Sequence, residues 1–348
     1  MSRAPSKIAP AIFAAACVLV TPILAEAQAV DFRGKQIRLI VGAATGGGYD
    51  ANGRVVARHI GRHIPGEPSV VVENMPGAGS VIMMNYLYNS APKDGSVWGL
   101  PTGTAAVEPR LKVMAREGAN VRFDPNKMRW LGTPAQQPQV LFVWHEKPFH
   151  TVDDLAKQKS IMGATSAATD NAILPTLMNQ MLGTKMEVVT GYRGTADILL
   201  AMERGEADGH VALLANLTVG KPDWFRDKKA RILVQFGAKR SAEIPDVPTA
   251  IELAKTPEDK ELLTFYSLKY DMAYPIGLPP GVPANVVSTL QKAFDATMTD
   301  AGLIKDARQI GLELSPLSGS VVESLMLKID QTPQSIIDRL VALTTVKK

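Results

Sequence analysis

The chain has 348 residues, of which 46% are hydrophobic and 21% are charged. This composition is typical of a folded globular protein and excludes a largely disordered chain. The net charge of +4 is too balanced for a nucleic-acid-binding face, and one cysteine excludes an intrachain disulfide, a four-cysteine zinc site and a thiolate-held iron–sulfur cluster. A chain of this length is expected to form two lobes or domains, because single cores stop growing near this size.

Residues 1–27 are predicted to be a cleaved export signal. Two basic residues precede a charge-free stretch over 8–25, and overlapping Ala-x-Ala motifs follow at 25–29. A positive start, an apolar middle and small residues at the cut are typical of a secretory signal peptide. The alternative, a membrane anchor, is disfavoured because two prolines and many alanines make a poor spanning helix. Cleavage would remove Cys17, and no second long apolar run follows, so we expect a soluble periplasmic protein.

The first part of the chain after this segment alternates strands and helices. Residues 37–41 predict a strand, and a helix follows from Asp50, taken as its N-cap, to Ile64. A strand at 70–72, a helix at 79–90 and a strand at 97–100 complete a β-α-β-α-β pattern. This order predicts a parallel sheet with helices on both faces.

A second α/β unit begins near residue 140, and mostly helical sequence follows residue 283. Strands are predicted at 140–144, 160–164, 186–190, 211–214 and 231–236, with helices at 171–182, 195–204, 285–299 and 320–343. The pattern predicts two α/β lobes, with the C-terminal helices packing back on the first.

A glycine-rich loop from Gly42 to Asp50 is the clearest candidate site. It lies between a strand and a helix, where helix N–H groups and the helix dipole bind anions and glycines let a ligand approach the backbone. Ligands of open α/β sheets bind at this edge. The loop matches neither the Walker pattern nor Gly-x-Gly-x-x-Gly. A loop that only needs glycines for positive φ remains an open alternative.

Three other strand-to-helix loops are further candidates. The loop at 165–171 is rich in hydroxyls, which could donate to a ligand carboxylate or merely cap the next helix, and both interpretations remain open. The other two loops are at 191–195 and 102–104.

Catalytic and metal-binding patterns are sparse. His59 and His63 have the spacing of two metal ligands on a helix, but no glutamate follows His59, and flanking arginines would repel a cation. We therefore predict a solvated cationic helix face and no metal site. The Gly-x-Ser-x-Gly elbow of serine hydrolases does not occur in the sequence.

Several segments, taken together, resemble the Bug/TctC-type extracytoplasmic solute receptors of tripartite tricarboxylate transporters. They run in the order of that family and cover nearly all of the chain after residue 27. They are the strand and loop at 37–50, the segment Val70–Gly79, which ends in Asn-Met-Pro-Gly-Ala-Gly, the turn at 91–95, the segments 191–194 and 205–208, the Pro-x-Val-Pro-Thr motif at 245–249 and the turn at 279–283.

The resemblance implies an α/β, two-lobed periplasmic binding protein fold, with a mostly parallel sheet in each lobe and the ligand in the cleft. The first lobe would span 28–137 and 270–348, and the second 138–269. The implied function is capture of a small organic carboxylate for delivery to membrane permease subunits, by a monomer without cofactor, metal or enzymatic activity. An exported enzyme acting on a small carboxylate and a receptor used for signalling remain alternatives.

The resemblance also implies the ligand-binding residues. In the first lobe they are Ala44, Thr45, Gly47 and Tyr49, and in the second Thr165, Ser166, Thr169, Asp170 and Tyr192. Thr102, from the loop at 102–104, and Asp208 complete the set of predicted ligand-binding residues. Tyr49 stands where the family usually has a small hydroxyl residue, so the identity of the carboxylate stays open.

Overall fold

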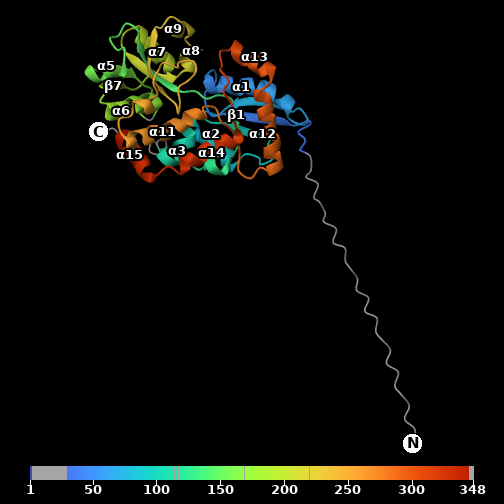
Figure 1. Cartoon of the computed structure of the whole chain (residues 1–348). Helices are drawn as coiled ribbons and strands as arrows, with labels where there is room; N and C mark the ends of the chain where they lie inside the picture. The colour runs from blue at the N-terminus through green and yellow to red at the C-terminus, as the bar shows by residue number, and fades with distance from the viewer. Residues whose placement is uncertain (2–29, 113–114, 116–117, 168, 219, 345–348) are drawn as a thin grey trace.

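The protein has two lobes, each built on its own β-sheet (Figure 1). The structure is a computed structural model that describes residues 1, 30–112, 115, 118–167, 169–218 and 220–344. Residues 2–27 of the predicted export signal, including Cys17, lie outside the described residues. The first lobe has a six-stranded sheet of order β11-β4-β10-β3-β1-β2, and the second a five-stranded sheet of order β7-β6-β8-β5-β9.

The first sheet has helices on both faces. Its strands are β1 (Gln36–Val41), β2 (Ser69–Asn74), β3 (Val97–Leu100), β4 (Arg129–Thr133), β10 (Ile276–Leu278) and β11 (Leu317–Ser318). Leu39 and Val41 pack in one core with α1 (Gly48–Ile60), α12 (Ala284–Met298) and α13 (Ala301–Gln309). Ile40 packs in the other, with α2 (Val81–Asn89), α3 (Gly103–Leu111) and α14 (Gly319–Asp330). Because both faces are covered, β1 is apolar and buried over its last three residues, Leu39, Ile40 and Val41.

The second sheet carries short helices and one long one. Its strands are β5 (Gln139–Trp144), β6 (Ser160–Gly163), β7 (Met186–Val189), β8 (Gly209–Leu213) and β9 (Ala230–Phe236). Its helices are α5 (Val152–Lys157), α6 (Asp170–Leu182), α7 (Thr195–Glu203), α8 (Ala215–Thr218), α9 (Pro222–Arg226) and α10 (Ala250–Leu253). Both sheets are mixed: β6 runs parallel to β7 and β8, whereas β5 is antiparallel to β8 and β9, and β10 is antiparallel to β3 and β4.

A layer of helices joins the two lobes. The long helix α11 (Pro257–Asp271) contacts α3 and α14 of the first lobe, as well as α10 and the last helix, α15 (Gln334–Thr344). The same α15 also packs on α6 of the second lobe, so the C-terminal part of the chain touches both lobes (Figure 1). The chain passes between the sheets at 134–138 and again at 272–275, between α11 and β10.

Two predicted helices have different limits in the structure. The helix predicted over 50–64 begins at Gly48, has Gly47 instead of Asp50 as its N-cap, and ends at Ile60 before a short 3₁₀ turn. The helix predicted over 320–343 is two helices, α14 and α15. They separate at Pro333, which has no N–H for a helical hydrogen bond.

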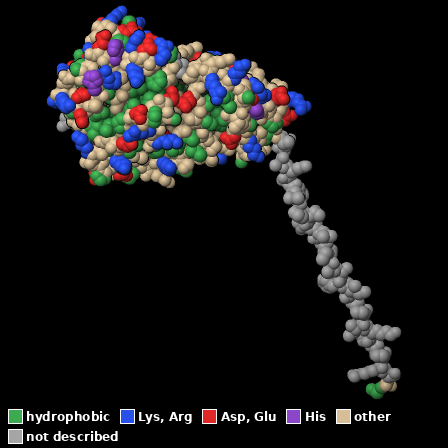
Figure 2. All heavy atoms as spheres, turned by 45° about the horizontal axis from the view of Figure 1, so that its top comes forward, with side chains coloured by type: hydrophobic (Ala, Val, Ile, Leu, Met, Phe, Trp, Pro, Cys, Tyr) green, Lys and Arg blue, Asp and Glu red, His purple; other side chains and the backbone are tan. Residues whose placement is uncertain are grey.

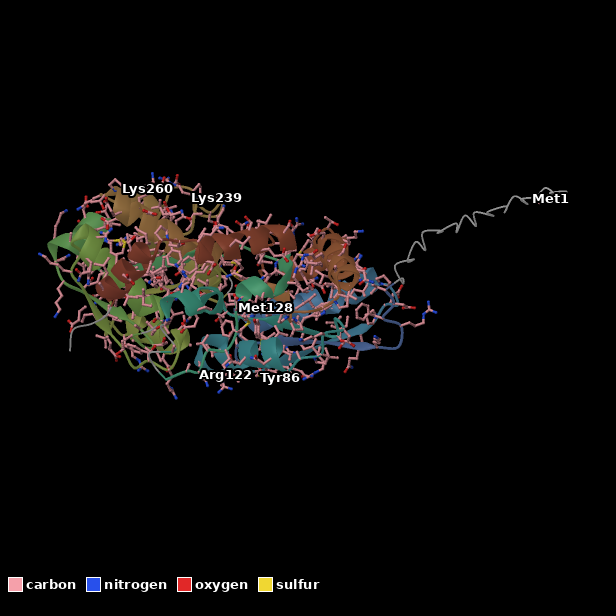
Figure 3. All side chains as sticks on the ribbon, turned by 90° about the horizontal axis from the view of Figure 1, so that it is seen from below. Met1, Tyr86, Arg122, Met128, Lys239 and Lys260 are labelled. Carbon is pink, nitrogen blue, oxygen red and sulfur yellow. The ribbon has the colours of Figure 1, made fainter. Side chains whose placement is uncertain are left out.

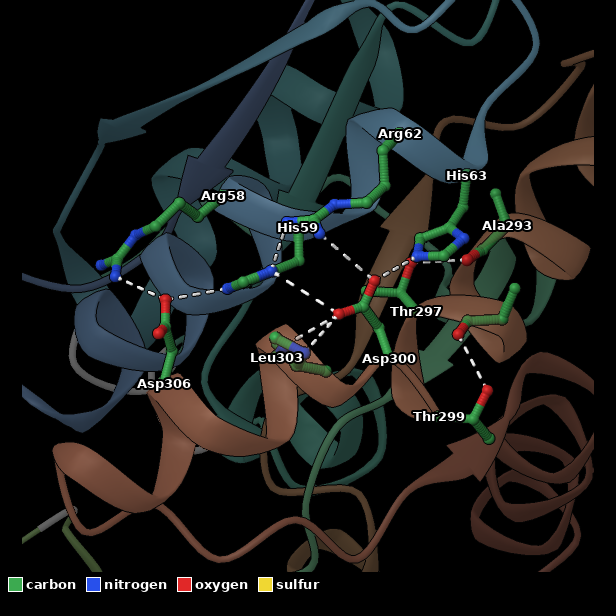
Figure 4. A network of polar contacts seen from close by, with 12 residues as sticks. Arg58, His59, Arg62, His63, Ala293, Thr297, Thr299, Asp300, Leu303 and Asp306 are labelled. Carbon is green, nitrogen blue, oxygen red and sulfur yellow. Dashed lines mark hydrogen bonds and ion pairs between the residues drawn. The ribbon is translucent and has the colours of Figure 1, made fainter.

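The cationic face at the end of α1 and in the 3₁₀ turn after it is only partly solvated, which corrects the prediction for His59 and His63: the Arg58 and Arg62 side chains are 59% and 50% exposed, whereas those of His59 and His63 are 6% and 25% exposed. Figure 4 shows that it packs against α13: His59 is buried, and its Nε2 lies 2.9 Å from Asp306 Oδ2, while His63 Nε2 lies 2.9 Å from Asp300 Oδ2. Arg58 pairs with Asp306 at 3.0 Å. The histidines therefore join two helices of the first lobe, and the described part of the chain holds no group of three or more His, Cys, Asp or Glu arranged for a metal.

The surface carries both signs of charge. Figure 2 shows lysine, arginine, aspartate and glutamate side chains interspersed over the face in view, as the small net charge suggests.

On another side, where Figure 3 labels Tyr86 and Arg122, hydrogen bonds hold the loop before β4 against α2. Asn85 Nδ2 donates to Asn120 O (2.6 Å), and Arg122 N donates to Asn85 Oδ1 (2.7 Å). Among the described residues, no helix combines the length and apolar character needed to cross a bilayer.

Candidate functional site

A cavity of about 630 Å³ lies between the lobes, at the carboxyl ends of β1, β3, β6 and β8. Both lobes contribute to its wall, as the sequence predicts for a ligand cleft. The first lobe provides Gly48, Tyr49, Ala78, Gly79, Thr102 and Thr104. The second lobe provides Gln139, Thr165, Ser166, Thr169, Asp170, Asn171, Gly194, Thr195, Val211, Ala212, Leu213 and Asn216.

Four helices of nine residues or more begin in this wall, α1, α3, α6 and α7, and the four-residue α8 also begins there. None of the four has a side-chain hydrogen bond at its N-cap, whereas α10, α11 and α13 do. The helices α2, α9, α12 and α14 also have no side-chain hydrogen bond at the N-cap, but their first residues are not part of this wall. First-turn N–H groups of these four helices, each with the partial positive charge of a helix N-terminus, therefore border the cavity. The first turns of α1, α6 and α7 also contain Asp50, Asp170 and Asp197, and each of these carboxylates is paired with a basic side chain.

Tyr49 is the main side chain of the first lobe in the wall. Its ring meets the ring of Tyr274 edge to face, with centroids 5.0 Å apart, and its hydroxyl accepts a hydrogen bond from Gly103 N (3.2 Å). Burial raises the pKa of Tyr49 to about 12; the hydrogen bond from Gly103 opposes this rise, and the nearby charge of Asp170 adds to it. The phenol therefore stays protonated near neutral pH and keeps a proton to donate to a ligand oxygen.

The glycine-rich loop positions the start of α1 but contributes little to the wall. Ala44, Thr45 and Gly47 are exposed and do not line the cavity, which differs from their predicted role. Gly46 has φ +86°, a conformation that favours glycine, and its N–H donates to Asp50 Oδ2 (2.9 Å). At Gly46 the loop therefore needs glycine for its turn, while Gly48 and Tyr49 at the end of the same loop line the cavity.

Asn74 and Ser80 support the first-lobe loops from behind. Asn74 Nδ2 donates to Ala43 O (2.9 Å), and Ser80 Oγ donates to Gly42 O (2.9 Å) and accepts from Thr102 N (2.9 Å). The family-like segment around residues 74–80 therefore fastens the loops that follow β1 and β3. Sequence reasoning gave it no such role.

The hydroxyls of the 165–171 loop divide into two kinds. Thr169 Oγ1 donates to Ser166 O (2.7 Å) and lies 2.5 Å from Asn171 Oδ1, so it stabilises the loop itself. The hydroxyl of Ser166 has no hydrogen bond to any described residue, although Ser166 lines the cavity. Thr165 Oγ1 lies 3.1 Å from Thr169 Oγ1. Of these three predicted residues, Ser166 has the hydroxyl that is open to a ligand.

Asp170 is held by a buried cation. Its Oδ1 accepts from Lys269 Nζ (2.5 Å) and from Tyr266 OH (2.8 Å), both on α11. The Lys269 side chain is 1% exposed, and its ammonium lies 3.8 Å from the ring centroid of Tyr266 and 5.1 Å from that of Tyr270. Burial lowers the pKa of Lys269, and the charge of Asp170 opposes that change. No local sequence signal pointed to this pair, because its members are 99 residues apart.

Two further predicted ligand-binding residues, Tyr192 and Asp208, do not line the cavity. Tyr192 packs in the core of the second lobe, beside Gly163. Asp208 pairs with Lys147 (2.7 Å) and accepts from Ile161 N (2.7 Å). It precedes β8, whose other end supplies Leu213 to the wall, so Asp208 lies at the far edge of the sheet and stabilises the strands there.

A second cavity, of about 430 Å³, is lined by residues of one connecting segment, 136–138, and by residues 239–242 and 270–271, the last two at the end of α11. Near it, burial and the neighbouring Glu313 raise the pKa of Glu243 to about 8. None of the helices α1, α3, α6 and α7 begins in its wall. The inter-lobe cavity is therefore the better candidate for a ligand site.

Sequence and fold comparisons agree on one family. The sequence profile of TctC, described as "Tripartite tricarboxylate transporter family receptor", matches residues 53–338. A UPF0065 protein in the gbd 5' region of Cupriavidus necator is 30% identical over 243 residues, covering 66% of this chain and 67% of that protein. A TctC solute binding protein from Polaromonas has the same fold at 18% identity, with a TM-score of 0.67 over 87% of this chain and 98% of the other. R. palustris Rpa4515, solved with adipate, is similar at 20% identity, with a TM-score of 0.66 over 90% and 98%.

Proposed function

The chain belongs to the family of tripartite tricarboxylate transporter receptors, and we propose that it captures a small organic carboxylate between its lobes and delivers it to the membrane permease of such a transporter. The observation that carries the proposal is the convergence of four uncapped helix N-termini on one inter-lobe cavity. Rpa4515, which shares the fold, was solved with a dicarboxylate.

Backbone groups supply the positive potential of this site. The described residues that line the cavity include no lysine, arginine or histidine. A carboxylate would instead accept hydrogen bonds from first-turn N–H groups and from hydroxyls such as those of Tyr49 and Ser166. Closure of the lobes on the anion would bring both sets of donors to one ligand.

The wall also supports binding over catalysis. Its described residues include no histidine or cysteine, and its one carboxylate, Asp170, is paired with Lys269. A nucleophile, a base and an orienting group are the minimum that a hydrolytic site needs. With export through the 1–27 segment, the protein would act in the periplasm as a monomeric receptor without enzymatic activity.

Ligand-dependent stabilisation tests the proposal. The protein lacking residues 1–27 is screened by thermal unfolding and calorimetry against mono-, di- and tricarboxylates, with neutral sugars as controls. A carboxylate at a hundredfold excess over its Kd should stabilise the fold by about 2.7 kcal/mol. Stabilisation by a neutral sugar and by none of the carboxylates would overturn the proposal.

A substitution at Gly194 tests the anion site itself. Gly194 is the N-cap of α7 and lines the cavity, its φ of −178° suits any residue, and a Cβ there would have no neighbour within 4 Å. Gly194→Asp adds a favoured helix cap and one negative charge, so the free protein should be as stable as the wild type or more stable. At about 5 Å and an effective dielectric constant near 20, repulsion of a bound carboxylate is about 3 kcal/mol, which weakens binding more than tenfold.

Gly194→Asn is the matched control, because it caps the helix equally well without the charge. It should bind within a fewfold of the wild type. Equal affinities in the Asp and Asn variants would show that no anion binds near the start of α7.

A further inference from the structure

Asp170 places an unused acceptor in the cavity wall. Both donors that hold it, Lys269 Nζ and Tyr266 OH, go to the same oxygen, Oδ1. Its Oδ2 has no hydrogen bond to the residues described here, while the residue lines the cavity and its side chain is 16% exposed. Burial and then the charge of Asp170 raise the pKa of Tyr270, also on α11, so its buried hydroxyl lies near this carboxylate, but it has no hydrogen-bond partner among the described residues. The carboxylate therefore has one oxygen fixed by α11 and one to which no described residue donates a hydrogen bond.

The position of Asp170 is fixed firmly enough to discriminate between ligands. Lys269 and Tyr266 are both buried on α11, and the lysine ammonium also lies over the tyrosine ring, 3.8 Å from its centroid. Lys269 balances the charge of Asp170, so the pair subtracts little from the positive potential of the four helix N-termini. The cavity can thus hold an anion and still present a carboxylate oxygen at one point of its wall.

That oxygen attracts a hydrogen-bond donor and repels another acceptor. Gln139, on the same wall, has a buried Oε1 without a partner among the described residues, and its amide can offer either an acceptor or a donor. An unsubstituted aliphatic acid has only acceptors and apolar groups, so it leaves Oδ2 of Asp170 desolvated and unpaired.

We propose that Asp170 is a specificity-determining residue that selects carboxylates carrying a hydrogen-bond donor, an ammonium or a hydroxyl group, over the unsubstituted acids of the same length. This inference rests on the proposed function and narrows its substrate class. Lys269 and Tyr266 are positioning residues: they act by fixing Asp170 and do not themselves line the cavity.

Matched ligand pairs test the proposal by calorimetry. The pairs are succinate with malate, succinate with aspartate, and propionate with lactate, and the members of each differ by one donor group. A hydrogen bond to a charged acceptor corresponds to roughly ten- to a hundredfold in affinity. The wild type should therefore bind the donor-bearing member at least tenfold more tightly in every pair that binds.

The variant that tests the residue is Asp170→Asn/Lys269→Met. Asparagine keeps an oxygen for Tyr266 but replaces Oδ2 with an NH₂ group, and methionine avoids an unpaired buried ammonium. The preference should fall to about onefold or reverse. Tyr266→Phe is the control: it removes one support of Oδ1 and leaves Oδ2 in place, so the preference should persist. Thermal unfolding checks that each variant is folded.

The outcomes separate this inference from the proposed function. Binding of carboxylates without a preference for the donor-bearing member, or a preference that survives in the double variant, would overturn the role of Asp170 alone. Failure of every carboxylate in the wider screen would overturn the carboxylate receptor as well.

Discussion

Replacing Asp170 with asparagine should destabilise the ligand-free protein strongly, because it leaves the Lys269 ammonium buried without its counter-charge. The lysine side chain is 1% exposed, and its other contacts are the rings of Tyr266 and Tyr270. Removing one partner of a buried ion pair costs about 3–5 kcal/mol. The protein can limit this cost by releasing the proton of Lys269. At pH 7, for a lysine with a pKa near 10.4 in the unfolded chain, that release costs about 4.6 kcal/mol.

The cost of releasing the Lys269 proton depends on pH, so the loss of stability in Asp170→Asn should depend on pH with a known sign. Burial lowers the pKa of Lys269 in the folded protein, and Asp170 opposes the shift, so Asp170→Asn lowers that pKa further. Between the folded and unfolded pKa values the unfolded state binds more protons, and stability then rises with pH by up to about 1.4 kcal/mol per unit. The deficit of the variant should therefore shrink to about 2 kcal/mol at pH 9.

Urea unfolding followed by circular dichroism at pH 7 and pH 9 measures both quantities. The double variant Asp170→Asn/Lys269→Met should regain most of the lost stability, because replacing a buried pair with uncharged groups of similar volume is often neutral. A single variant within 1 kcal/mol of the wild type at pH 7 would refute the reasoning. So would a deficit that does not narrow with pH.

Three further predictions concern other parts of the fold. Ser166→Ala should weaken carboxylate binding by about 1.5–3 kcal/mol without changing the stability of the free protein. Thr169→Ala should instead destabilise the free protein by about 1 kcal/mol, since Thr169 Oγ1 is hydrogen-bonded within its own loop. Calorimetry measures the first effect and urea unfolding the second. Gly319→Ala should cost at least 1–3 kcal/mol in urea unfolding, because a Cβ there collides with the backbone oxygen of Trp130. Burial and Glu313 raise the pKa of Glu243 in the folded protein to about 8, so the folded state binds more protons than the unfolded state. The free energy of unfolding should therefore fall as the pH rises from about 4.5 to 8. Glu243→Gln should remove this fall, and a variant whose stability falls as steeply as that of the wild type would contradict the assignment.

Strands and their loops could be predicted because their signals are local. The apolar run of β1 and the hydroxyls of the 165–171 loop each occupy a few consecutive residues, and the structure places both at the inter-lobe cavity or its supporting sheet. The start of α1 was harder to predict, because Asp50 looks like a cap but its carboxylate accepts from Gly46 N and is bonded to Arg54. The three-residue β10 and the two-residue β11 are too short for a periodic pattern.

Other features depend on partners distant in sequence. Helix α11 lies between the lobes and contacts α3 and α14 as well as α10, so its buried residues do not form the single apolar stripe that a sequence pattern detects. The histidines of α1 looked solvated because the carboxylates of Asp300 and Asp306 come from about 240 residues later. Asp170 was found through its loop, but nothing local showed that Lys269 pairs with it.

The cavity divides affinity and selectivity between two kinds of groups. The helix N-termini of α1, α3, α6 and α7 offer backbone N–H groups, which any sequence that folds this way would supply, so under the proposed function they account for binding of an anion as such. Side chains then distinguish one carboxylate from another. A carboxylate such as Asp170 is tolerated in an anion site only because Lys269 neutralises it from behind, outside the reach of the ligand. It follows that Asp170 and Lys269 must change together if the ligand class changes. An apolar residue at position 170 alone would leave the buried lysine unpaired. Replacing both residues would convert a cavity that selects donor-bearing carboxylates into one suited to unsubstituted acids.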